Sequence, residues 1–243
     1  MTRASNRRHI VECLHRTRLE PYLEAANHNE RNALALYRWN VQLTAAFQEL
    51  LSVTEVILRN AMDRELQKWN NNENGVPTSW LLHPPARPLR SLSQGKRLDA
   101  IRLANNTASK REATHRRHGH PVTHDDVLAQ VMFGLWKDLL PNHVDNAGDA
   151  TSNSNRARMW NEALINAFPN IADPSGEVTF WRVARLHGLR NRVSHMENLL
   201  GVDVPERTRD IFDLVGSISE PARDWATGLN RVTSTYRARP EAS

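Results

Sequence analysis

The chain has 243 residues, of which 40% are hydrophobic and 24% are charged, and its formal net charge is +5. This length allows one large domain or two small ones with a sizeable core, and the composition is that of a globular protein. A modest positive charge suits a nucleic-acid partner without requiring one. Because Cys13 is the only cysteine, an intramolecular disulfide is excluded, which fits a reducing compartment.

Neither an export signal nor a membrane span is expected from the sequence. The N-terminal segment MTRASNRRHI carries charge, but no apolar stretch of the signal-peptide type follows it. No segment approaches the roughly eighteen consecutive apolar residues that a membrane-spanning helix needs. We therefore expect a cytoplasmic protein without a membrane partner.

The hydrophobic pattern predicts an all-α fold. Apolar residues recur at helical spacing, and few segments alternate as strands do. The sequence NNNENG after Trp69 and four prolines in residues 77–88 interrupt the helical pattern. In chain order we expect helices over residues 7–26 (interrupted near Pro21), 29–70, 93–117, 123–140, 155–168, 175–200 and 205–237, the last with a kink or break at Pro221. Thr123 and Asp125 are the N-cap candidates for the helix that begins there.

We expect a single domain over residues 1–243. The core of this domain should span about residues 17–200, with additional loops and short elements in its middle region, and a C-terminal helix should follow over about residues 205–237. The long second helix should bury one stripe, which is spaced by three, four or seven residues: Leu36, Trp39, Leu43, Phe47, Leu50, Ile57 and Ala61.

The segment RNRVSH, residues 190–195, is the strongest candidate for chemistry. On a helix of about 100° per residue, Asn191 and His195 stack on one side, and Arg190 and Ser194 form a second stacked pair. Asn and Ser are weak helix formers, so their presence beside a cation and an imidazole indicates a role other than helix stability. The alternative interpretation is an ordinary solvated helix face.

Other polar residues support this candidate site or have a purely structural explanation. His187 lies near the motif on the same helix. Glu55, Arg59 and Asn60, with Asp63, lie on the long helix, where Glu55–Arg59 and Arg59–Asp63 have the spacing of ion pairs. They are either a salt-bridged flank of the apolar stripe or a layer that orients the motif.

The segment KREATHRRHGHPVTH, residues 110–124, is rich in cations and histidines. Lys110, Arg111, Arg116 and Arg117 predict a surface that contacts RNA phosphates. The histidines, His115, His118, His120 and His124, raise the alternative of a metal site. No cysteine or carboxylate completes a standard ligand spacing, so we expect no metal.

Five segments occur in an order that resembles the Abi-like proteins, bacterial proteins of abortive-infection type within the HEPN superfamily. They are LYRWN (36–40), EVILRN (55–60), VMFGLW (131–136), AFP (167–169) and LRNRVSHME (189–197). The resemblance covers roughly residues 17–200, and its last segment is the most specific. Family members often have His-His-Glu where this chain has His195-Met196-Glu197.

The resemblance implies a HEPN-type helical bundle and a metal-independent endoribonuclease without a cofactor. It assigns the catalytic roles to Arg190, Asn191 and His195. From their positions in the sequence we expect Ser194, His187, Glu55, Arg59 and Asn60 to support this site. Since the chain has one copy of the motif, the resemblance also implies a homodimer that pairs two copies. The expected role is phage defence or toxicity, with a possible antitoxin or regulatory RNA as a partner. The alternatives are a non-catalytic RNA-binding or regulatory module that uses the same polar face, and a helical structural dimer.

Overall fold

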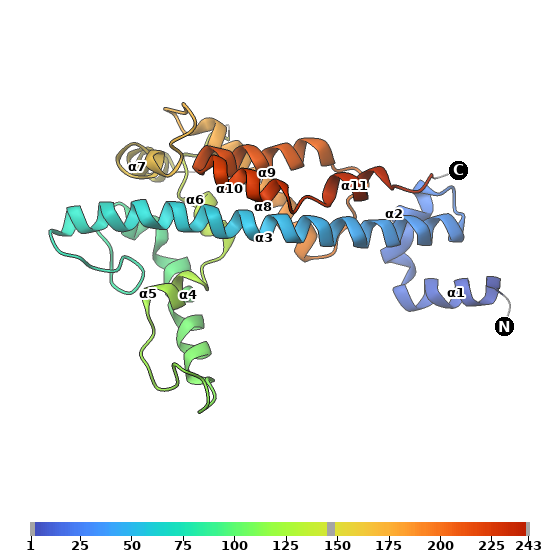
Figure 1. The fold of residues 1–243 in the computed structure, drawn as a ribbon, viewed down its shortest axis with the longest axis horizontal. Helices are drawn as coiled ribbons and strands as arrows, with labels where there is room; N and C mark the ends of the chain where they lie inside the picture. Colours follow the sequence, from blue (N-terminus) through green and yellow to red (C-terminus); the bar gives the residue numbers. More distant parts are fainter. Residues whose placement is uncertain (1–2, 145–148, 242–243) are drawn as a thin grey trace. The chain divides into compact units, whose positions relative to one another are not determined.

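The computed structural model describes residues 3–144 and 149–241, and all regular secondary structure within them is helical. The prediction of an all-α protein is therefore confirmed. Figure 1 labels the helices, whose bounds in chain order are α1 (Arg3–Leu14), α2 (Arg16–Ala25), α3 (Glu30–Asn74), α4 (Leu89–Ser109), α5 (His124–Leu128), α6 (Phe133–Asp138), α7 (Ala150–Glu162), η1 (a 3-10 turn, Leu164–Ala167), α8 (Glu177–Ser194), α9 (Val204–Ile218), α10 (Glu220–Thr227) and α11 (Val232–Arg237).

The chain divides into two compact units. The first contains residues 1–53, 188–212 and 224–243, and the second contains residues 54–187 and 213–223. The long helix α3 contributes its N-terminal half to the first unit and its C-terminal half to the second. That the whole chain folds as one domain stays a prediction.

The first unit is organised by α2 and the start of α3. Its buried cluster consists of Leu19, Tyr22, Leu23, Ala26, Ala33 and Leu36. Tyr22 meets Tyr37 edge to face at 5.2 Å between ring centroids. The indole of Trp39 donates a hydrogen bond of 2.8 Å to the carbonyl of Thr235, and the guanidinium of Arg239 lies over the same ring.

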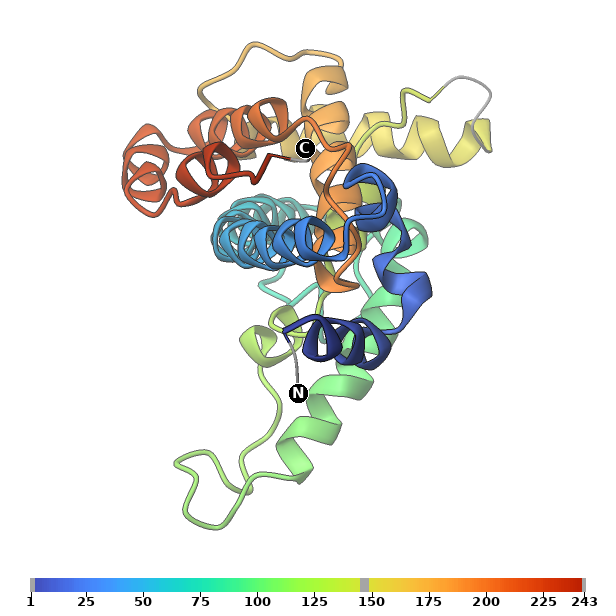
Figure 2. The ribbon, with the colours of Figure 1, turned by 90° about the vertical axis from the view of Figure 1, so that its right-hand side faces the viewer.

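The second unit is built around large aromatic side chains. Trp80 and Trp136, both fully buried, meet edge to face at 6.3 Å. Trp160 stacks on Phe168, and the indole of Trp69 donates to Glu162 at 2.9 Å. In Figures 1 and 2 the C-terminal end of α4 and the loop after it extend away from the rest of this unit.

The predicted stripe of α3 is buried as expected, except that Ile57 is only half-buried. Beyond residue 57 the buried face instead contains Leu58, Met62, Leu66 and Trp69. By length and composition alone α3 is apolar enough to cross a membrane, but 44% of its most apolar window is buried in the structure. Core helices of soluble proteins meet the same criterion, so the absence of a membrane span stays a prediction.

Two predicted helices end earlier than expected, the first helix of the chain and α4. The first helix breaks at His15, at φ 66°, and Pro21 lies inside α2, because Leu19, Tyr22 and Leu23 are buried at helical spacing around it. Helix α4 ends at Ser109 instead of near Arg117. Arg111 and Arg117 both bind Asp126, and a continuous helix would turn these two positions about 120° apart.

The expected helix over residues 123–140 is broken between α5 and α6. Residues 129–132 lie between the two helices, and Val131 and Phe133 are both buried, which a helix with a single buried face would not allow at two positions two residues apart. Thr123 is confirmed as an N-cap, since it forms a reciprocal capping box with Asp126. The last expected helix breaks just before Pro221, as predicted, and again before α11.

Candidate functional site

The RNRVSH motif lies at the C-terminal end of α8, in the first unit. We expected the helix to continue to residue 200, but it ends at Ser194, and His195 is the first residue beyond it. The backbone N–H of His195 still donates to the carbonyl of Asn191 at 3.0 Å, so these two residues remain one turn apart. The imidazole therefore lies at the negative end of the helix dipole, which stabilises a positive charge.

The turn after His195 has the hydrogen bonds of a Schellman motif. Met196 N–H donates to the carbonyl of Val193 at 3.1 Å, and Glu197 N–H donates to that of Arg192 at 2.8 Å. Met196 has φ 54°, the left-handed conformation that this turn requires and that glycine usually supplies. The side chains of Arg192 and Glu197 form an ion pair at 3.3 Å across the same turn.

Two residues from the N-terminal part of the chain hold this turn. The guanidinium of Arg18 donates to the carbonyl of Met196. Asn40, only 2% exposed, accepts a hydrogen bond from Leu199 N–H at 2.7 Å and donates to the carbonyl of Glu197 at 3.4 Å. Sequence reasoning assigned neither residue to the site. The sequence contained one clue to this role: the amide Asn40 follows large apolar residues in the segment LYRWN, which is typical of a buried position.

The side chains of the motif differ in their access to solvent. Arg190 and Asn191 are half-buried, whereas Ser194 and His195 are exposed. Leu189 and Val193 anchor this end of the helix in the core. The motif thus combines a partly buried cation and amide with an imidazole that solvent and ligands can reach.

Of the five supporting residues predicted from sequence, Ser194 lies within the motif and the other four fall in the second unit. His187, Glu55, Arg59 and Asn60 lie in the second unit, whereas the motif lies in the first. The predicted ion pair between Arg59 and Asp63 does not form, because the Asp63 carboxylate binds the side chains of Trp80 and His124 instead. His187 packs against the ring of Phe133 at 5.7 Å between centroids.

The four basic residues after α4 fall into two pairs. Arg111 donates to Asp126 at 2.9 Å, and Arg117 donates to both oxygens of this carboxylate at 2.6 Å. The hydrogen bond from Arg117 holds the pKa of Asp126 well below its usual range. Lys110 and Arg116 are exposed and have no carboxylate partner among the residues that the structure describes.

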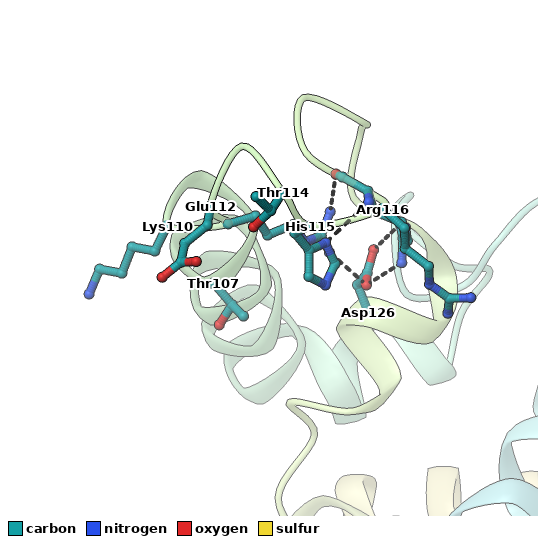
Figure 3. Close-up of a pocket in the computed structure, with 9 residues that line it drawn as sticks. Thr107, Lys110, Glu112, Thr114, His115, Arg116 and Asp126 are labelled. Atoms are coloured by element: carbon teal, nitrogen blue, oxygen red, sulfur yellow. Dashed lines mark hydrogen bonds and ion pairs between the residues drawn. The ribbon is translucent and has the colours of Figure 1, made fainter.

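We call residues 110–117 with Asp126 the basic lobe; all of them except Ala113 line a depression of about 690 Å³. Figure 3 shows Lys110 extending away from the cluster, while dashed lines join Asp126 to the two paired arginines. Arg111 and Arg117 therefore build the lobe, and Lys110 and Arg116 are available to an anionic ligand.

Three of the four histidines in and near the basic lobe make side-chain contacts within the protein. His115 Nδ1 accepts from Arg117 N–H, and His118 Nδ1 lies 2.8 Å from the carbonyl of Arg111. His124 binds Asp63 and Ser79. Within residues 3–144 and 149–241, no group of three or more His, Cys, Asp or Glu side chains is arranged to hold a metal ion.

No protein-family model matches the chain, and no match was found among curated proteins or solved structures. Membership of the Abi-like or HEPN groups accordingly stays a prediction from the motif segments.

Proposed function

We propose that this protein is a metal-independent endoribonuclease of HEPN Abi type that acts in the cytoplasm in phage defence or as a toxin. One observation carries the proposal: an exposed imidazole, His195, lies one helical turn after a half-buried amide and guanidinium and is held by a braced turn. A rigid pair of cation and imidazole is what cleavage of a ribose-phosphate linkage needs.

The chemistry follows from the two charged groups. An imidazole can both accept and donate a proton, so His195 is suited to act on the 2′-OH or on the leaving 5′-oxygen. Arg190 supplies fixed positive charge to the phosphate as negative charge accumulates in the transition state. Asn191 orients the imidazole or binds a phosphate oxygen. The products would be a 2′,3′-cyclic phosphate and a 5′-OH.

Cleavage by this route uses one group to remove a proton and another to deliver one. Each chain supplies one motif, so we propose a homodimer in which two copies of His195 share these tasks. A neighbouring antitoxin or regulatory RNA would keep such an enzyme silent. The basic lobe would bind the RNA backbone through Lys110 and Arg116.

The test is cleavage of structured and unstructured RNA in EDTA by wild type, His195→Ala and Arg190→Ala. We expect His195→Ala to abolish cleavage, and Arg190→Ala to cost about 2–4 kcal/mol of transition-state stabilisation, a loss of roughly 30- to 1000-fold. His9→Ala, which removes an exposed histidine on α1, is the matched control and should cleave like wild type.

The outcomes separate the candidate functions. Equal cleavage by all variants would point to a contaminating nuclease and contradict the proposal. RNA binding without cleavage by the wild type would favour a non-catalytic binding module. Ultracentrifugation at micromolar concentration tests the dimer, and a monomer there would contradict the shared site.

A further inference from the structure

The second unit contains a hydrogen-bonded Ser–His–Asp arrangement that the nuclease proposal does not use. Ser79 Oγ lies 2.8 Å from His124 Nδ1, and His124 Nε2 lies 3.0 and 3.1 Å from the two oxygens of Asp63. The indole of Trp80 donates to the same carboxylate at 2.8 Å and fixes its position. The three residues come from a loop, the first turn of α5 and the C-terminal half of α3.

The hydrogen bonds define the direction in which a proton would move. Asp63 requires a proton on His124 Nε2, which leaves the Nδ1 lone pair of the neutral ring to accept the hydroxyl proton of Ser79. Burial lowers the pKa of His124, but the hydrogen bond and charge of Asp63, with the charge of Asp125, outweigh it and raise this pKa above its usual value. The carboxylate thus stabilises the imidazolium that proton transfer from Ser79 would create.

The arrangement opens on a surface depression of about 600 Å³ that Ser79, His124 and Asp63 all line. Asn71 also lines it, and its Oδ1 accepts from Gln67 Nε2 at 2.8 Å and from Thr78 N–H at 3.0 Å. These contacts fix the amide, and its Nδ2 has no hydrogen-bond partner among the described residues. Nδ2 is therefore a donor available to an oxyanion in the depression.

The charged groups around the depression compensate one another. Arg64 and Lys68 are both exposed at its rim, and both pair with the single carboxylate of Glu65 at 3.1 and 2.9 Å. Asp63 also lines the depression, so two carboxylates balance these two cations.

We propose that Ser79, His124 and Asp63 form an acyl-transfer site that hydrolyses small esters. A nucleophile hydrogen-bonded to a base that a third group orients is the arrangement by which serine hydrolases are recognised, whatever their fold. The Oγ of Ser79 also accepts the N–H of Leu82 at 3.1 Å, and a hydroxyl oxygen retains a second lone pair for attack.

The reaction balances without a metal or redox partner. Ser79 Oγ forms a bond to the ester carbonyl carbon while its proton passes to His124 Nδ1, and Asn71 Nδ2 donates to the oxyanion. The bond from carbon to the alcohol oxygen then breaks, and the alcohol leaves with the proton from Nδ1. Water attacks the acyl-serine by the same route, which releases the acid and returns the proton to Oγ.

The test is covalent labelling of the whole protein with a fluorophosphonate, mapped by peptide mass spectrometry, together with hydrolysis of p-nitrophenyl acetate. We expect the adduct on Ser79 and at least tenfold faster labelling than at Ser91, an exposed serine that donates to the carbonyl of Pro88 and has no imidazole partner. Ser79→Ala and His124→Gln should lose both labelling and hydrolysis, while Ser91→Ala should retain them.

The pH profile separates catalysis from a structural role. Hydrolysis should rise with pH as His124 loses its proton, and Asp63→Asn should move that transition to lower pH. Labelling of wild-type Ser79 no faster than Ser91 overturns the proposal, and this measurement does not depend on how the variants fold. Hydrolysis that persists in folded Ser79→Ala, as judged by circular dichroism, overturns it as well.

Discussion

The side-chain oxygen of Asn40 accepts the backbone N–H of Leu199 at 2.7 Å, four residues after the candidate catalytic imidazole of His195. Asn40 lies on α3 and is 159 positions away from Leu199 in the sequence. Both residues are buried, so the amide is the partner of a backbone group that water cannot reach. Asn40 also donates to the carbonyl of Glu197, and this second hydrogen bond joins the segment LYRWN to the segment LRNRVSHME, the first and last of the five that resemble the Abi-like proteins.

The first prediction concerns this contact. Asn40→Ala leaves the N–H of Leu199 buried without a partner, which should lower the free energy of unfolding by about 1–3 kcal/mol. Because the turn also places His195, RNA cleavage by the folded variant should fall by up to about a hundredfold. Urea denaturation and cleavage assays measure the two effects.

Gln42→Ala is the matched control, since Gln42 is exposed on the same helix. It should change stability by less than about 0.5 kcal/mol and leave cleavage unaltered. An Asn40→Ala protein as stable as this control would refute the role given to the amide.

The second prediction uses the left-handed residue in the turn. Met196 has φ 54° and a side chain that is 43% exposed, so it carries backbone strain with little burial in return. Met196→Gly should raise the free energy of unfolding by about 0.5–1 kcal/mol, because glycine adopts this conformation without a steric penalty. Met196→Ala removes the same side chain but keeps Cβ, so a gain of equal size in this control would contradict the explanation.

Local patterns predicted the helices but not where long-range contacts end them. The stripe from Leu36 to Leu50 and the cap at Thr123 follow from spacing and residue type, and both are confirmed. The end of α8 depends on Arg18 and Asn40, which bind the turn from distant positions. The hydrophobic periodicity of residues 175–200 therefore could not predict where this helix ends.

The candidate sites also combine features that local sequence predicts with contacts that only the fold reveals. Sequence spacing groups His124 with His115 and His118, whereas its partners Ser79 and Asp63 lie 45 and 61 positions away. Likewise, four cations in one segment predicted four phosphate contacts, but Asp126 pairs with Arg111 and Arg117. Composition identified the charged segment, and only the fold separates its structural cations from its available ones.

The third prediction tests that separation. The double variant Lys110→Ala/Arg116→Ala should weaken RNA binding and reduce the slope of log affinity against log salt by about 0.7–0.9 for each phosphate that the variant no longer neutralises. Its thermal stability should not change, because neither side chain has a carboxylate partner among the described residues. Fluorescence anisotropy over a salt series provides the measurement.

Arg102→Ala is the control for charge alone, since Arg102 is exposed on α4 and pairs with Asp99. If this variant reduced the salt slope as much as removal of Lys110 and Arg116, binding would depend on net charge and not on the basic lobe.

The fourth prediction concerns the pH dependence of stability in the second unit. The pKa of His124 is raised in the folded protein, so the protonated ring is bound more tightly there than in the unfolded chain. The resulting stability is fully present below the unfolded pKa of about 6.5 and is lost as pH rises through the higher, folded pKa. Wild type should therefore exceed His124→Gln in stability by more at acidic than at alkaline pH.

Urea denaturation between mildly acidic and alkaline pH, followed by tryptophan fluorescence, tests this difference. Trp80 is a suitable reporter because its indole N–H binds Asp63, the carboxylate that pairs with His124. Comparison with the variant cancels titration of the other histidines, which both proteins share. A stability difference that stays constant or grows as pH rises would mean that Asp63 does not stabilise the protonated ring. The raised pKa, and with it the charge pairing assigned to this cluster, would then be wrong.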